Sequence, residues 1–227
     1  MFRINELILE DRSRAQALTA RLAHSQAVTP DDRAWLTQLA VKYKVLGSTS
    51  EQLGPDAFPE LLLRVDIVPP ALSLAQAASE SGWGTSRFAA QGNSLFGQWT
   101  FGKGLKPAEQ RISELGDYRV AAFDSTAQAA YSYTMDLNTG RAYRDLRSKR
   151  ADLRRQGLRT SGTALADTLR NYSERGQAYV NDLKALIRQN RLDDADDAYL
   201  RHMAVIHIVA AGPGGSRTPP TDGGNII

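Results

Sequence analysis

The most informative segment of the chain reads Pro70-Ala71-Leu72-Ser73-Leu74-Ala75-Gln76-Ala77-Ala78-Ser79-Glu80. Proline is favoured at the first position of a helix, and nearly all of the side chains that follow are small or apolar. A helix that is apolar on most sides is buried in its protein. Gly82 and Gly84 come next, and glycine commonly ends a helix. The segment therefore predicts a buried helix over residues 71–80 with a carboxylic acid in its last turn.

The position of Glu80 is suited to a catalytic acid. Because the helix is buried and Trp83 is near, desolvation should raise the pKa of the Glu80 carboxyl and keep it protonated near neutrality. A protonated carboxyl can give its proton to the oxygen of a leaving sugar while the glycosidic bond breaks. The alternative from spacing alone is structural: Glu80 faces solvent in the last turn, or accepts hydrogen bonds from the glycine amides that follow.

The composition changes over residues 95–123, where aromatic residues and glycines precede a polar stretch and a second apolar run. Two short strands around a long loop fit this pattern. Phe96, Trp99 and Phe101, with Asn93 and Gln98 beside them, could line a carbohydrate groove, because sugars offer flat C–H faces to rings and hydroxyls to amides. A hairpin whose aromatic side chains fill a small core is the alternative.

Helical patterns lie on both sides of this region. Residues 5–24 have a thin apolar stripe, and Thr29-Pro30 is a strong start signal for a second helix, so residues 1–50 are predicted to form a helical hairpin. Further helices are predicted from Ser125, Tyr143, Thr163 and Gln177 onward. Residues 210–227 are rich in glycine and proline and cannot bury enough apolar surface to fold, which predicts a disordered tail.

Composition excludes several classes of protein. The chain has 227 residues, of which 42% are hydrophobic and 23% charged, the profile of a soluble globular domain. The absence of cysteine excludes disulfide scaffolds, thiol catalysis and thiolate metal sites. The three histidines lie far from any acid cluster, so no metal site is expected. The longest apolar run near either end, residues 203–211, is shorter than the ~18 residues a membrane span requires.

Residues 141–159 are strongly basic. They hold eight basic and two acidic residues, a local charge of +6 in a chain of net charge +3. We interpret this segment as a solvated helical face; attraction to an anionic wall polymer or membrane surface is the second reading. Nucleic acid is not the expected partner, because the arginines spread around the helix and aromatic residues do not alternate with them.

The residues from Leu74 to Phe88, LAQAASESGWGTSRF, and from Gly92 to Trp99, GNSLFGQW, resemble the active-site segment of a known family. This family comprises the bacterial Bax-type proteins of the FlgJ-like glucosaminidase group, glycoside hydrolase family 73, with a mannosyl-glycoprotein endo-β-N-acetylglucosaminidase-like domain. The resemblance continues through residues 136–143 and 172–180 and covers roughly residues 5–209.

The resemblance implies a mainly α (α+β) fold, in which a lysozyme-like α-rich lobe and a small β-hairpin lobe enclose a glycan cleft. It places this domain at residues 51–209, with the β-lobe at about residues 95–123, and the helical hairpin of residues 1–50 packed on it. It implies cleavage of β-1,4 bonds next to N-acetylglucosamine and assigns Glu80 the role of general acid. Tyr172 falls on the family's cleft tyrosine.

The second catalytic group stays open. In the family it comes from the β-lobe, where Glu109, Glu114 and Asp117 are candidates. A carboxyl ~6.5 to 9.5 Å from Glu80 would activate a water and invert the anomeric centre, whereas ~5 to 5.5 Å would suit a covalent intermediate. A third option uses the N-acetyl group of the substrate as the nucleophile. Gly140 also departs from the family, which has a histidine at that position.

We therefore expect a peptidoglycan hydrolase; the alternative is a non-catalytic peptidoglycan-binding or scaffold protein that uses the same cleft. We expect a monomer that acts on peptidoglycan glycan strands without metal or other cofactor. No secretory signal is visible, so a periplasmic or envelope location implies an upstream signal or anchor, and a complete chain would be cytoplasmic. The candidate substrate-binding residues are Trp83, Asn93, Phe96, Gln98, Trp99, Tyr133 and Tyr172.

Overall fold

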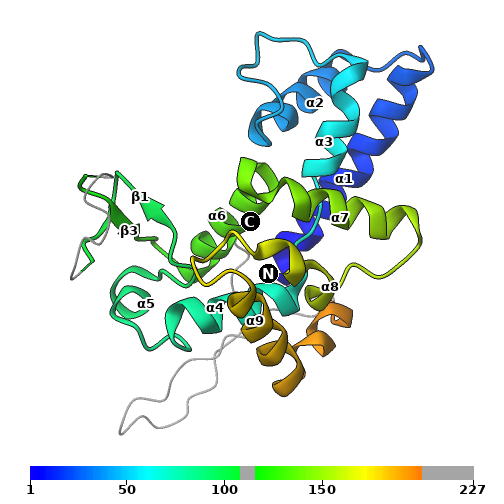
Figure 1. Ribbon diagram of the computed structural model, residues 1–227. Coiled ribbons are helices and arrows are strands. Elements are labelled where there is room, and N and C mark those ends of the chain that lie inside the picture. The colour runs from blue at the N-terminus through cyan, green and yellow to red at the C-terminus, as the bar shows by residue number, and fades with distance from the viewer. Residues whose placement is uncertain (108–115, 201–227) are drawn as a thin grey trace, which may run out of the picture.

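A computed structural model describes residues 1–107 and 116–200, shown in Figure 1. The longer elements are α1 (Phe2–Ala23), α2 (Pro30–Lys42), α3 (Phe58–Arg64), α4 (Pro70–Ser81), α5 (Arg87–Gly92), β1 (Trp99–Thr100), β2 (Gly104–Leu105), β3 (Arg119–Ala121), α6 (Thr126–Thr139), α7 (Arg144–Arg155), α8 (Gly162–Ala166) and α9 (Gln177–Gln189). Short 3₁₀ turns are η1 (Pro55–Ala57), η3 (Arg141–Tyr143), η4 (Asp167–Leu169) and η5 (Leu192–Asp197). The tail predicted over residues 210–227 lies outside the described residues.

The predicted fold class is confirmed: an α-rich lobe carries a small β-lobe, as in lysozyme-like proteins. The β-lobe projects from one side of the helices in Figure 1, with α5 at its base. The described sheet is antiparallel, with strand order β1-β3-β2, and both Trp99 and Leu105 pair with Val120. The sequence predicts two short strands around a long loop within residues 95–123. The structure has a third strand, β2, inside the stretch predicted as a loop.

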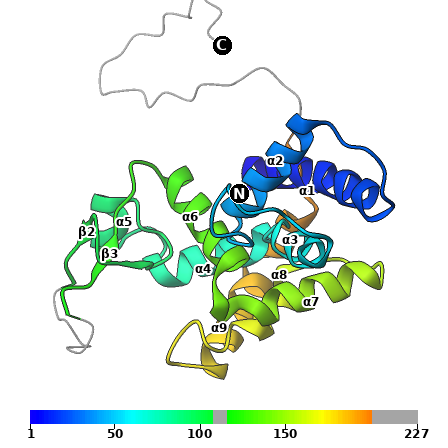
Figure 2. The same cartoon turned by 90° about the horizontal axis from the view of Figure 1, so that it is seen from above.

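The predicted buried helix, α4, lies at the centre of the α-rich lobe. Ala71, Leu72 and Ala75 are completely buried, and the main apolar core gathers around them from α6, α7, α8 and α9. Figure 2 shows α4 with α6, α8 and α9 around it. Gly162 at the start of α8 allows close approach, because a Cβ there would lie 2.6 Å from the Leu72 backbone nitrogen. The core therefore holds α4 in one orientation.

A single carboxylate fixes the N-termini of two of these helices. Asp196 accepts hydrogen bonds from the backbone N–H of Ala71 at 2.8 Å and from that of Gly162 at 2.7 Å. The first amides of a helix have no partner within the helix and favour negative charge. Asp196 thus pins the start of α4 to the start of α8.

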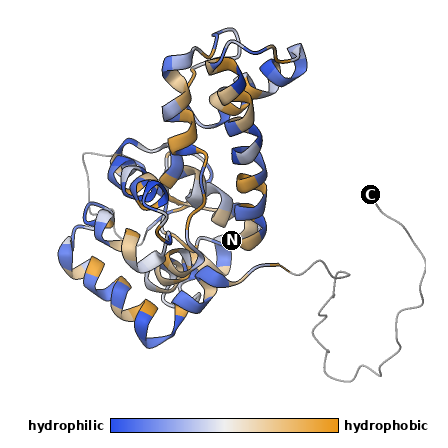
Figure 3. Cartoon of the chain, turned by 90° about the vertical axis from the view of Figure 1, so that its right-hand side faces the viewer, coloured by the Kyte–Doolittle hydropathy of each residue, from blue (hydrophilic) through white to orange (hydrophobic). Residues whose placement is uncertain are grey.

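The N-terminal helices have a second core of their own. Ile8, Ala15 and Leu18 of α1 pack with buried residues of α2 and with Leu61 and Val65 at α3. The predicted start of α2 is confirmed, since Thr29 accepts from the Asp32 amide. In Figure 3 the helices carry both apolar and polar segments, as expected where one face packs into a core. The helical hairpin contacts the rest of the α-rich lobe through α3 and through α1, where Asn5 donates to the Val68 carbonyl at 2.8 Å.

The sequence predicts that the basic segment, residues 141–159, is a solvated helical face. The structure shows that part of this segment is buried. Arg147 and Arg150 of α7 are 2% and 0% exposed. Arg150 donates to the backbone carbonyls of Leu63 at 2.9 Å and Ile67 at 2.6 Å. Carbonyl oxygens that no helix or strand uses supply the partners a buried guanidinium needs. The prediction of a solvated face is therefore wrong for these two arginines.

A buried carboxylate completes this arginine cluster. Asp66 accepts a two-pronged hydrogen bond from Arg154 and lies 3.6 Å from Arg150 and 3.7 Å from Arg12. Burial acts to raise the pKa of Asp66, but Arg150, Arg154 and Arg12 outweigh it, so the pKa lies below its usual value. We call these four side chains the arginine hub; it ties α1 and α7 to the chain just before α4.

Candidate active site

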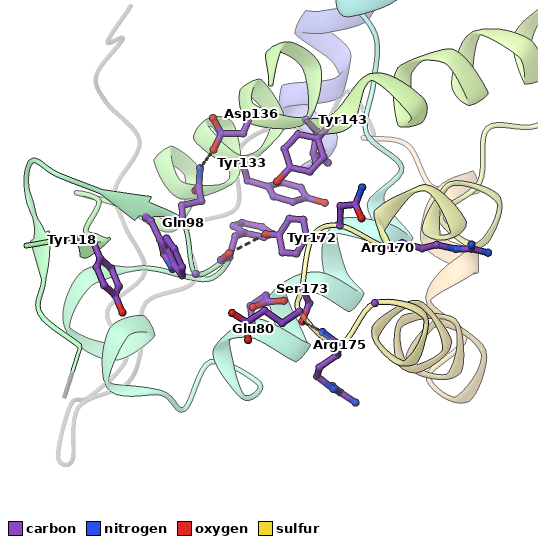
Figure 4. A pocket seen from close by; sticks show the side chains of 17 residues that line it. Glu80, Gln98, Tyr118, Tyr133, Asp136, Tyr143, Arg170, Tyr172, Ser173 and Arg175 are labelled. Carbon is purple, nitrogen blue, oxygen red and sulfur yellow. Dashed lines mark hydrogen bonds between the residues drawn. The ribbon is translucent and has the colours of Figure 1, made fainter. Parts of the chain in front are cut away.

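A cavity of about 1190 Å³ opens where α4, α6, β1 and residues 170–176 meet, and we call it the cleft. Figure 4 shows the side chains that surround it. Its lining comes from segments far apart in the sequence: Glu80, Phe96, Gly97, Gln98, Trp99, Tyr118, Tyr133, Asp136, Leu137, Tyr143, Arg170, Asn171, Tyr172, Ser173, Glu174, Arg175 and Gly176.

Glu80 lies in the cleft at the end of α4, where the left-handed Gly82 terminates the helix. Burial raises the pKa of the Glu80 carboxyl above its usual value, although a hydrogen bond from Tyr179 and the charge of Arg175 oppose the rise. Gly97, with φ +61°, passes close by: a Cβ there would lie 3.4 Å from Glu80 Oε2. The carboxyl is thus enclosed yet opens into the cleft, as a general acid requires.

Aromatic rings make one wall of the cleft. Phe96 and Tyr133 stack with centroids 4.0 Å apart, and Tyr172 stacks on Tyr179 at 5.6 Å. Tyr172 also donates to the Phe96 carbonyl at 3.0 Å, which joins residues 170–176 to the entrance of the β-lobe (Figure 4). Burial raises the pKa of Tyr133 and Tyr172, so both phenols stay neutral and can donate hydrogen bonds.

Polar groups lie next to these rings. Gln98 Nε2 donates to Ser132 of α6 at 3.0 Å. It also donates to Asp136 of α6 (Figure 4). The exposed Trp99 ring tilts against Tyr118 with centroids 5.0 Å apart. The cleft therefore combines apolar rings with carboxyl and amide groups.

The structure brings together five of the seven residues named as substrate-binding candidates: Phe96, Gln98, Trp99, Tyr133 and Tyr172 all line the cleft with Glu80. Trp83 and Asn93 are not among the lining residues. Trp83 is 63% exposed, on a turn with φ +58° just after α4. Asn93 ends α5 in the left-handed region and donates to the Phe123 carbonyl at 2.9 Å, so it ties α5 to the end of the β-lobe.

The candidates for a second carboxylate lie elsewhere. Glu109 and Glu114 fall outside the described residues. Asp117 is exposed and forms ion pairs with Lys106 at 3.0 Å and Arg119 at 3.2 Å, and these hydrogen-bonding partners lower its pKa. It does not line the cleft.

Several lining residues escaped the sequence analysis. Asp136 follows Tyr133 by three residues on α6, so both share a helix face, and this spacing is a signal that could have identified it. Tyr143, Arg170 and Glu174 carry no comparable local signal. The structure also explains why residue 140 is glycine where the family has histidine. A Cβ at Gly140 would lie 2.7 Å from the Asp136 carbonyl oxygen.

Neither a metal site nor a membrane-spanning helix is found among the described residues. No group of three or more histidine, cysteine, aspartate or glutamate side chains within residues 1–107 and 116–200 is placed to hold a metal ion. In that same part of the chain, no helix has both the length and the apolar character needed to cross a membrane.

Comparison with known proteins gives two matches. Residues 56–192 match the glucosaminidase family, described as mannosyl-glycoprotein endo-beta-N-acetylglucosaminidase. The chain is also 34% identical over 163 residues to "Protein bax" of Escherichia coli strain K12, a match that covers 72% of this chain and 57% of that protein. The chain thus spans little more than half the length of this relative. No solved structure gives a significant match.

Proposed function

Because the chain belongs to the glucosaminidase family, we propose that it is a peptidoglycan hydrolase in which Glu80 is the general acid. The bond cleaved is a β-1,4 glycosidic bond next to N-acetylglucosamine. The observation that carries this proposal is the enclosed Glu80 carboxyl, which lies in a large cleft and has a raised pKa.

The chemistry follows from the protonation of Glu80. A carboxyl whose pKa is raised by burial retains its proton at a pH where an exposed glutamate is ionised. It can therefore protonate the glycosidic oxygen as the bond to the anomeric carbon breaks. Glu80 is left as a carboxylate, which Tyr179 and Arg175 stabilise.

The lining suits a glycan strand. Tyr172 and Trp99 offer rings to the C–H faces of sugar units, and Gln98 and Asp136 offer polar groups to hydroxyls and N-acetyl amides. The strand would cross from Trp99 on the β-lobe past Glu80 to residues 170–176. Because peptidoglycan is a wall polymer, this substrate implies that the protein acts in the cell envelope.

Two described carboxylates besides Glu80 line the cleft, Asp136 and Glu174, and we consider Asp136 as the second group because a hydrogen bond would orient it. Asp136 lies on α6 and accepts a hydrogen bond from Gln98, which would orient it. If Asp136 activates a water, Asp136→Asn abolishes hydrolysis. If the substrate's own N-acetyl group attacks, the variant keeps most activity while substrates without that group are not cleaved.

The experiment that tests the proposal compares the wild type with Glu80→Gln on purified peptidoglycan, by release of reducing ends. We expect Glu80→Gln to lose about 10² to 10⁴-fold in kcat, because amide nitrogen cannot supply the acidic proton. Glu10→Gln is the matched control, since Glu10 is exposed on α1 away from the cleft. Equal activity of the wild type and Glu80→Gln would refute the assignment.

A non-catalytic peptidoglycan-binding protein remains the second candidate function. One observation favours it: the described β-lobe carboxylate, Asp117, is paired with two cations outside the cleft. This alternative predicts that the wild type releases no reducing ends but sediments with peptidoglycan, and that Trp99→Ala weakens that binding.

A further inference from the structure

Three polar residues of α4 lie on the same side of the helix. Ser73, Gln76 and Glu80 are spaced by three and four residues, which is one face of an α-helix. Ser73 and Gln76 are 1% and 0% exposed. Burying a polar side chain costs free energy unless it is hydrogen-bonded. Ser73 donates to the Pro69 carbonyl at 3.3 Å, whereas the partners of Gln76 come from the neighbouring helices.

The partners form a chain of hydrogen bonds with a defined direction. Tyr133 of α6 donates to Gln76 Oε1 at 2.6 Å, and Gln76 Nε2 donates to the Tyr179 hydroxyl of α9 at 3.0 Å. An amide N–H can only donate, so the Tyr179 oxygen is its acceptor. The Tyr179 proton is then available to a second acceptor, and Glu80, one turn after Gln76 on the same face of α4, is the carboxyl that acts on Tyr179.

We propose that Gln76 and Tyr179 are positioning residues for Glu80, and this inference rests on the proposed function. Tyr179 donates to one oxygen of the Glu80 carboxyl, so the acidic proton sits on the other oxygen, which faces the glycan. When Glu80 gives that proton to the glycosidic oxygen, the carboxyl becomes a carboxylate and the hydrogen bond from Tyr179 strengthens. Tyr179 keeps its own proton, and Gln76 holds Tyr179 in the donating orientation.

Other groups also face Glu80 and must be kept constant in a test. Besides Tyr179 of α9 they are Arg175 from the preceding loop, Tyr133 of α6, Tyr143 of η3 and Tyr172. Arg175 is the cation among them and pairs with Asp182. A Tyr179→Phe variant removes only one hydroxyl and leaves the stack on Tyr172 in place.

The first test measures the titration of Glu80 by NMR of chains labelled at the glutamate side-chain carboxyl carbon, assigned with Glu80→Gln. Loss of the donor should move the Glu80 midpoint to higher pH in Tyr179→Phe, because the hydrogen bond favours the charged form. The control is Tyr43→Phe, since Tyr43 is buried in the N-terminal core and its hydroxyl has no hydrogen-bond partner among the described residues. An unchanged midpoint in Tyr179→Phe overturns the proposal. This reading does not depend on hydrolysis, so it stands apart from a failure of the proposed function.

The second test uses kinetics with Gln76→Leu, which keeps the volume but removes both hydrogen bonds. Because Gln76 has no exposed surface and does not line the cleft, we expect kcat to fall about tenfold while KM stays within about twofold. In Tyr179→Phe the alkaline limb of the kcat/KM profile should move to higher pH. A rise in KM with unchanged kcat in Gln76→Leu contradicts a positioning role.

A third measurement needs no variant that could misfold. In the wild type labelled at the tyrosine Cζ atoms, at least one tyrosine signal should follow the Glu80 midpoint, because a donor senses the charge of its acceptor. If no tyrosine signal follows that transition, Tyr179 does not donate to Glu80 and the proposal fails.

Discussion

Asp66 and Glu80 are two carboxyl groups withdrawn from water near the two ends of α4, yet their pKa values shift in opposite directions. Asp66 sits in the arginine hub, where Arg150, Arg154 and Arg12 overcome the effect of burial and lower its pKa. Glu80 sits among tyrosines with one cation, Arg175, and there burial prevails and the pKa rises. The comparison shows that the number of nearby cations, more than burial, decides which carboxyl holds the structure and which can carry a proton.

The largest effect is expected from Asp66→Asn. It leaves three arginines without their shared counter-charge, and removing one partner of a buried ion pair costs about 3 to 5 kcal/mol. Urea unfolding should show this loss at neutral pH. The matched control is Asp124→Asn, which removes a pair with Lys103 whose side chains are both 76% exposed, and should leave the free energy of unfolding nearly unchanged. Equal losses of unfolding free energy in the two variants would show that the buried arginine hub stabilises the protein no more than an exposed ion pair does.

A smaller effect is expected at the cleft from Trp99→Ala. Because Trp99 is largely exposed, its removal should leave the unfolding free energy nearly unchanged and raise KM for peptidoglycan by up to about tenfold, the value of one stacked ring. Phe101→Ala is the control, since Phe101 is 75% exposed and does not line the cleft. If Trp99→Ala and Phe101→Ala have the same KM for peptidoglycan, the exposed ring of Trp99 does not contact the glycan.

The smallest expected effect is on the pH dependence of the free energy of unfolding, to which Asp66 and Glu80 contribute with opposite signs. The stabilisation from Asp66 is present above the pKa of an unfolded aspartate and is lost as the pH falls through its lowered folded pKa. For Glu80 the folded pKa is raised, so stability falls as the pH rises from the unfolded to the folded value, and the cost persists at neutral pH. Glu80→Gln should therefore be slightly more stable than the wild type at pH 7 and equal to it at low pH. A less stable Glu80→Gln would place Glu80 with Asp66 as a structural group.

The sequence predicted the surroundings of Glu80 better than those of Asp66. A long apolar helix that ends in Glu80 and two glycines is a local pattern, and the structure has α4 at residues 70–81 in the core. The arginine hub was missed because local charge does not reveal which arginines face backbone carbonyls from distant segments. Arg150 reaches Leu63 and Ile67, more than eighty positions earlier in the chain.

The same limit applies within the cleft. Phe96, Gln98 and Trp99 follow a recognisable motif, and all three line the cavity. Arg170 enters it only because the loop before α9 folds against α4, and no local pattern indicates that. Asp136 enters it with α6, and its spacing from Tyr133 is the local signal that could have identified it. Trp83 lies beside Glu80 in sequence, but three successive left-handed residues, Gly82 to Gly84, hold it on an exposed turn. Proximity in sequence is a weak guide where the backbone reverses.

The central claim is that Glu80 is held protonated in the cleft in order to act as the acid. It is tested most directly by the pH dependence of kcat/KM of the wild type on purified peptidoglycan. The predicted result is a rate that falls as the pH rises through a pKa above that of an ordinary glutamate, because the acid then loses its proton. A rate that is flat across that range, or that rises as an ordinary glutamate ionises and does not fall again, would contradict the assignment.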